Sequence, residues 1–140
     1  MTLQEICRQD TEDPTQLRQA YAETLGETIS QVGADTVEKE TSVSVDHASR
    51  ITDGDVGELR FQQAAEIMAL NGPVEADTII DEIRDDLLMG MATAVLDVDT
   101  IAASTDLDLT GQEVQQALEG RARMTMAELA IIQAFIASRK

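Results

Sequence analysis

The chain has 140 residues, of which 43% are hydrophobic, and 27 acidic residues against 10 basic ones give a net charge of −17. This length suits one ordinary domain or two very small ones, and the hydrophobic fraction argues against a disordered chain. The single cysteine, Cys7, excludes an internal disulfide bond.

Two observations bear on the cellular location. The longest apolar run, Leu87 to Leu96, is too short to span a bilayer. The first ten residues lack both the basic start and the apolar stretch of a signal peptide. We therefore expect a cytoplasmic protein without a membrane-spanning segment.

The first predicted helix has clear signals at both ends. Asp13 supplies a capping oxygen and Pro14 has a φ angle suited to the first helical position. Apolar residues then recur every four positions up to Val32, and Gly33 is a natural stop. We therefore predict a helix over residues 14–32.

The rest of the chain continues the helical pattern. Asp46 is the expected cap of the third helix, and Asn71-Gly72-Pro73 marks a break. The run LLMGMATAVL has no polar face, which is typical of a helix in the centre of a structure. The further helices are predicted over residues 34–41, 46–51, 60–70, 74–96, 98–105, 110–119 and 125–138, and Thr110 is the expected cap of the helix that ends at Glu119.

The sequence also repeats itself. Apolar and polar positions in the first half recur in the same order in the second half, with a helical spacing. The matched blocks are Asp35-Thr36-Val37 with Asp99-Thr100-Ile101, and Leu59-x-Phe61 through Leu70 with Met124-x-Met126 through Phe135. A duplicated helical unit is the natural interpretation. We divide the chain into a lead-in (1–12, in which Leu3 and Ile6 dock on the body), a first copy (13–72) and a second copy (73–140).

Each copy resembles the lambda-repressor-like helix-turn-helix family, over about residues 15–70 and 85–138. That family has an aliphatic-Ala pair, then Gly-aliphatic at the turn, and an aliphatic residue six positions before a Gly. In the second copy the corresponding residues are Ile101-Ala102, Asp106-Leu107, Val114 and Gly120, with two extra residues between Asp106 and Val114. The first copy has the family's spacing from Ser42-Val43 through Ala48 to Gly54, with Glu38 at the Ala position. The resemblance implies an all-α fold of tandem helix-turn-helix-like units sharing one core, and DNA binding.

The composition resembles that of proteins from salt-accumulating archaea, because it is acidic and poor in Lys and aromatic residues. A dense carboxylate surface keeps a protein soluble in molar salt. The whole chain also looks like members of an uncharacterised haloarchaeal protein family, on the segments Leu87–Met91, Ala94–Asp99 and Ile136–Lys140. The other interpretation is an acidic protein of ordinary cytosol, where a charge of −17 argues against nucleic acid.

The DNA-contact candidates lie in the second copy, where the residues from Thr110 onward carry four basic and three acidic side chains. Glutamine can pair with adenine in the major groove, and arginine binds phosphate. The same residues also suit a solvated helix whose C-terminal dipole attracts arginine. The candidates are Thr110, Gln112, Gln115, Gln116, Arg121 and Arg123.

The alternative function is a helix-turn-helix-derived protein-interaction scaffold or homodimer that does not bind DNA. The apolar run supplies its self-association candidates, Leu87, Leu88, Met89 and Met91. We predict no enzyme activity, no cofactor and no metal site. His47, the single histidine, has no nucleophile in a recognisable motif with it, and the spacing of Asp53, Asp55 and Glu58 does not match a calcium-binding EF-hand loop.

Overall fold

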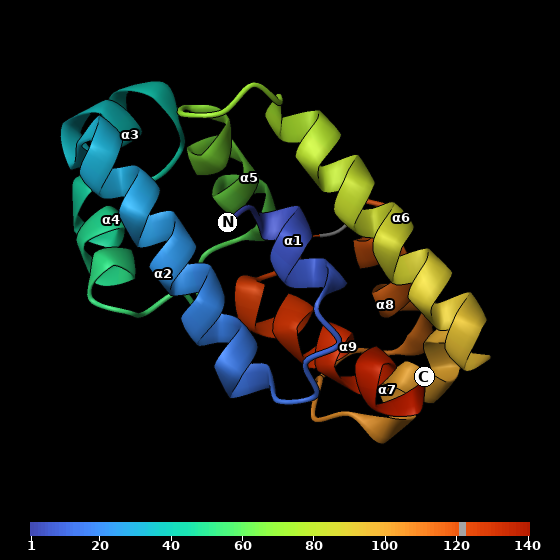
Figure 1. Cartoon of the computed structure of the whole chain (residues 1–140). Coiled ribbons are helices and arrows are strands. Elements are labelled where there is room, and N and C mark those ends of the chain that lie inside the picture. The colour runs from blue at the N-terminus through green and yellow to red at the C-terminus, as the bar shows by residue number, and fades with distance from the viewer. Residues whose placement is uncertain (121–122) are drawn as a thin grey trace.

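The computed structural model describes residues 1–120 and 123–140 (Figure 1). In these residues the chain is all-helical, as predicted, with one isolated antiparallel bridge between Arg60 and Thr125. The helices are α1 (Leu3–Arg8), α2 (Pro14–Val32), α3 (Ala34–Glu40), α4 (Val45–Thr52), α5 (Phe61–Ala69), α6 (Ala76–Ala94), α7 (Val98–Ser104), α8 (Gly111–Leu118) and α9 (Met126–Arg139).

Helix α2 begins and ends where its local signals predict. The Asp13 carboxylate accepts a hydrogen bond from the Thr15 backbone N–H at 2.9 Å, and Pro14 opens the helix. Gly33 follows with φ of 90°, a conformation that residues with a Cβ rarely adopt. Both ends depend on neighbouring residues alone, which explains the agreement.

Helix α4 is capped by Ser44, two residues before the predicted cap Asp46. The Ser44 hydroxyl accepts a hydrogen bond from the His47 backbone N–H at 3.1 Å. Asp46 instead lies in the first turn, where a negative charge favours the helix dipole. Serine and aspartate are both good N-caps, and the sequence alone does not rank two of them so close together.

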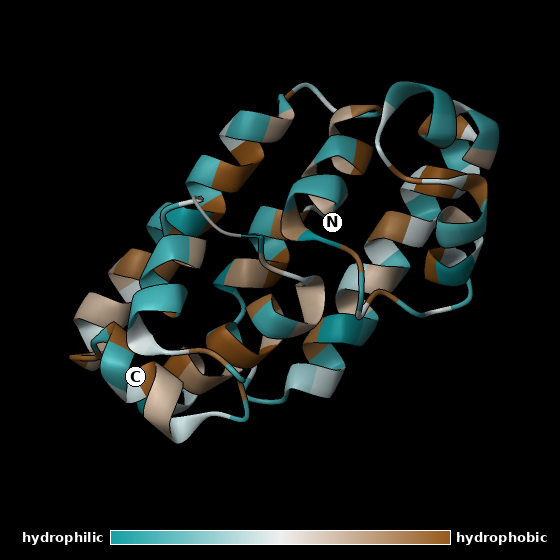
Figure 2. Ribbon diagram, turned by 180° about the vertical axis from the view of Figure 1, so that it is seen from behind, coloured by the Kyte–Doolittle hydropathy of each residue, from teal (hydrophilic) through white to brown (hydrophobic). Residues whose placement is uncertain are grey.

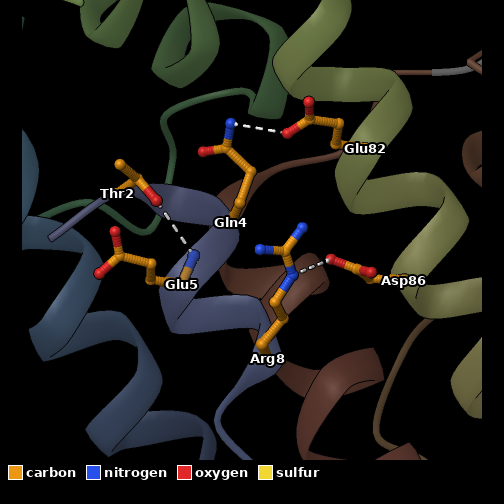
Figure 3. A network of polar contacts seen from close by, with 6 residues as sticks. All are labelled: Thr2, Gln4, Glu5, Arg8, Glu82 and Asp86. Atoms are coloured by element: carbon orange, nitrogen blue, oxygen red, sulfur yellow. Dashed lines mark hydrogen bonds and ion pairs between the residues drawn. The ribbon is translucent and has the colours of Figure 1, made fainter.

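The predicted lead-in contains a helix, α1, that lies between the two long helices α2 and α6 (Figure 1). Leu3 and Ile6 dock on the body as predicted and are fully buried. Two polar contacts fix α1 to α6 (Figure 3): Gln4 donates to Glu82 at 3.1 Å and Arg8 donates to Asp86 at 3.2 Å. Helix α1 is therefore part of the core.

The two halves contain the same succession of helices. Each has a 19-residue helix, then helices of seven and eight residues, then the helix that follows the bridge. Two backbone hydrogen bonds of 2.7 Å accompany the bridge, from Phe61 N–H to the Met124 carbonyl and from Met126 N–H to the Leu59 carbonyl. Residues that match in the sequence repeat therefore pair with each other.

The packing inside the two halves differs. Both long helices pack on α1, α5 and α9, but α2 also packs on the two short helices of its own half, α3 and α4, whereas α6 makes few contacts with α7 and α8. Helices α7 and α8 pack chiefly on each other. The second half therefore presents its two short helices as a pair at one end of the molecule.

The apolar run Leu87–Leu96 is not the central buried element that its composition predicts. Hydrophobic and hydrophilic residues alternate along the helices (Figure 2). In the run, Leu87 and Met91 face the core, whereas Leu88, Met89 and Val95 are exposed. The run is the end of an outer helix, so only one of its faces is covered.

Among the described residues, no single helix is long and apolar enough to cross a membrane. Helices α6 and α7 satisfy the length and composition criteria only when taken together, and they meet at an angle of 86°.

Candidate nucleic-acid interface

Helix α8 starts at a well-formed cap. The Thr110 hydroxyl accepts a hydrogen bond from the Glu113 backbone N–H at 3.2 Å, and the Glu113 carboxylate accepts one from the Thr110 N–H at 3.0 Å. This reciprocal pair satisfies two backbone donors at the helix start. Thr110 therefore has a structural role, which the sequence also predicts.

The contact between α7 and α8 is close enough to need glycine. A Cβ atom added at Gly111 would lie 3.1 Å from the Cα atom of Asp99 and would collide with its carboxylate. The lack of a side chain at Gly111 lets the first turn of α8 approach the first turn of α7. Val114 and Leu118 then point into the core and fix the rotation of α8.

The predicted glutamines lie on the outer side of α8. Gln112 and Gln115 are exposed and Gln116 is half-buried. Their spacing puts them on one face of the helix together with Glu119, and Gln115 Nε2 donates to Glu119 Oε1 at 3.0 Å. The structure thus brings these three candidates together on an accessible face.

The charge beside this face is mixed. Exposed carboxylates border α8 at Asp106, Asp108, Glu113 and Glu119. Arg123 is exposed on the loop before α9, whereas the predicted contact Arg121 lies outside the described residues.

Arg123 also lines a cavity that the sequence did not predict. The cavity has a volume of about 160 Å³ and lies where α5, α6 and the end of α8 meet. Its charged lining residues are Arg60, Arg84 and Arg123, which are distant in the sequence. Only the pairing of the two halves brings them together, so no sequence motif could have identified the group.

The four self-association candidates are divided between core and surface. Leu87 and Met91 are buried in the core. Leu88 is 48% exposed and Met89 is 69% exposed, and Val95, at the end of the same helix, is 89% exposed. Val95 has φ of 57°, which is a strained conformation for a β-branched residue.

Cys7 and His47 lie apart from these surfaces. Burial, with the nearby Asp86 carboxylate, raises the pKa of the Cys7 thiol to about 12, which makes it a poor nucleophile. Partial burial, with the nearby Arg50, lowers the pKa of His47. Among the described residues, no three His, Cys, Asp or Glu side chains are grouped to hold a metal ion.

One family model matches most of the chain. A model of a family of unknown function, DUF5791, matches residues 17–139. The chain belongs to this DUF5791 family. The matched residues include both halves, the α7–α8 pair and the arginine-lined cavity, while α1 lies before them. The comparisons with curated proteins and with solved structures gave no match.

Proposed function

We propose that this protein is a DNA-binding regulatory protein of a halophilic archaeon, built from two helix-turn-helix-like units, and that it uses the second unit. The observation that carries the proposal is the α7–turn–α8 arrangement, in which a capped helix presents Gln112 and Gln115 to solvent, with the half-buried Gln116 beside them. Glutamine side chains on an accessible helix suit base edges in the major groove.

The pairing of the halves supports the tandem arrangement. Leu59 to Phe61 meets Met124 to Met126 in an antiparallel bridge, as equivalent segments of a symmetric dimer would. A single chain thereby holds two turn-and-helix pairs in one body. Symmetric DNA-binding dimers use the same principle to span two half-sites.

The acidic surface is consistent with this function only at high salt. In molar salt the screening length is about 3 Å, so carboxylates around α8 repel phosphate weakly. The same screening reduces the counterion release that drives most DNA binding. Base contacts from α8 must therefore supply a larger share of the affinity than in an ordinary basic repressor.

The DNA test uses mobility shift and fluorescence anisotropy on genomic fragments in molar potassium chloride. Arg121→Ala together with Arg123→Ala is expected to weaken binding to every sequence, because both side chains would contact phosphate. The slope of log affinity against log salt should fall by about 2.

The matched control is Arg18→Ala with Lys39→Ala, which changes the net charge equally but lies in the first copy. The control should bind as the unmodified protein does. Equal losses in both double variants would show a general charge effect, and no retention of any fragment by the unmodified protein would contradict the proposal.

A second candidate function, a protein-interaction scaffold or homodimer, is favoured by the exposed side chains of Leu88, Met89 and Val95. Exposed apolar side chains grouped on one helix end are suited to protein association. Light scattering should then give a dimer mass that Leu88→Glu reduces to a monomer mass. Gln19→Glu, on the exposed side of α2, is the control, and a monomer mass for the unmodified protein would contradict this candidate.

A further inference from the structure

The cavity between α5, α6 and the loop after α8 has an unusual charge for this protein. Acidic residues outnumber basic ones by 27 to 10 in the chain, yet among the described residues three arginines and no acidic residue line this cavity. The remaining described lining residues are Phe61, Gln62, Ile80, Ala117, Gly120 and Met124. A positive cavity in so negative a molecule indicates a site for an anion.

Two of the three arginines are not neutralised by a carboxylate, unlike several basic residues elsewhere in the described chain. Arg8, Arg50 and Lys140 form ion pairs with Asp86, Glu58 and Asp10. Within the described part of the chain, Arg60 and Arg123 have no ion pair. Two guanidinium groups without carboxylate partners beside a third repel one another, and a bound anion would relieve that repulsion.

Arg84 is held in position from two sides. Its Nε–H donates to the Leu118 carbonyl at the end of α8, and its Nη1 lies 3.5 Å from the exposed Asp81 carboxylate. Gly120, with φ of 76°, passes beside the same guanidinium group. Arg84 therefore connects the cavity directly to the last turn of α8.

The start of α5 adds to the positive character of the cavity. Its N-cap is Arg60, which has no hydrogen-bond acceptor in its side chain, and its first turn has no acidic residue. The equivalent helix α9 instead has Thr125 as its cap, with Glu128 in its first turn. The Phe61 N–H already donates to the Met124 carbonyl, but no carboxylate in the first turn offsets the positive end of the α5 dipole.

We propose that this cavity binds a phosphate group carried by a small molecule. Arginine guanidinium groups bind phosphate oxygens in bidentate pairs, which suits an oxyanion better than chloride. A volume of about 160 Å³ is below that of sites for drug-sized ligands, so the ligand is inorganic phosphate or a small phosphate monoester. Through Arg84 the ligand would also influence how α8 is presented, a consequence that rests on the proposed DNA-binding function.

The test is a titration of the full chain with inorganic phosphate and with methyl phosphate, followed by calorimetry and by the backbone amide resonances of Gln62 and Gly120. Potassium chloride at matched ionic strength is the reference. Saturable binding is expected for both phosphates and not for chloride. Arg60→Gln and Arg123→Gln should each weaken it about tenfold, because a charge-assisted hydrogen bond is lost.

Arg18→Gln, an exposed arginine on α2, is the matched control and should leave phosphate binding unchanged. Resonance changes that do not saturate, or that chloride reproduces, would overturn the proposal. An equal loss of phosphate binding in Arg18→Gln would also overturn it.

A short DNA duplex tests the other source of phosphate. Binding of the duplex through Arg60 without binding of free phosphate would assign the cavity to DNA and overturn the proposal. The phosphate titration contains no DNA, so its result does not depend on whether the protein binds DNA.

Discussion

Replacing Leu3 and Ile6 together with alanine is expected to lower the free energy of unfolding by about 4 kcal/mol or more, because each buried truncation costs about 2–5 kcal/mol. Both side chains are fully buried between α2 and α6. The measurement is urea unfolding followed by far-ultraviolet circular dichroism. The polar contacts of Gln4 and Arg8 cannot compensate, since Arg8 is exposed and its ion pair contributes little.

The reactivity of the Cys7 thiol shows whether α1 is released from the body in the double variant. Its pKa of about 12 leaves little thiolate at pH 8, and release of α1 would bring the pKa back near 8.5 and raise the alkylation rate about a thousandfold. Leu88→Ala, which truncates a half-exposed side chain, is the control and should change both measurements little. A double variant as stable as this control would show that α1 does not belong to the core.

Gly90→Leu is expected to lower the free energy of unfolding by about 2 kcal/mol or more, which is typical of overpacking in a core. A Cβ atom at Gly90 would lie 2.9 Å from Cγ2 of Ile136 on α9. Ile136 is buried and β-branched, so its side chain has few other positions to adopt. The gain in helix propensity, about 1 kcal/mol, does not offset the collision. Thermal and urea unfolding measure the change.

Ala92→Leu is the matched control, because Ala92 lies two residues further along the same helix and is exposed. It should be neutral or slightly stabilising. Adding Ile136→Ala to Gly90→Leu should restore part of the lost stability, since the added side chain then fills the space that isoleucine leaves. A Gly90→Leu protein as stable as the Ala92→Leu protein would contradict the close approach of α6 and α9.

The structural features of the candidate site were predicted in part. The cap at Thr110 and the outward face of Gln112 and Gln115 follow from spacing within one helix, and the structure agrees. The exposure of Leu88 and the burial of Leu87 do not follow from the sequence, because an apolar run gives no sign of which face has a partner. The arginine cavity was missed, since Arg60, Arg84 and Arg123 meet only after the two halves pair.

The sequence by itself determined the local features: the start of α2 at Asp13 and Pro14, its end at Gly33, and the all-helical class. These depend on hydrogen bonds and dihedral preferences within a few residues. Only the tertiary structure decided that α1 fills the space between α2 and α6, that one face of the apolar run stays exposed, and that three arginines share a cavity. Each of these depends on contacts between residues far apart in the chain, and burial is a property of the partners that the packing supplies.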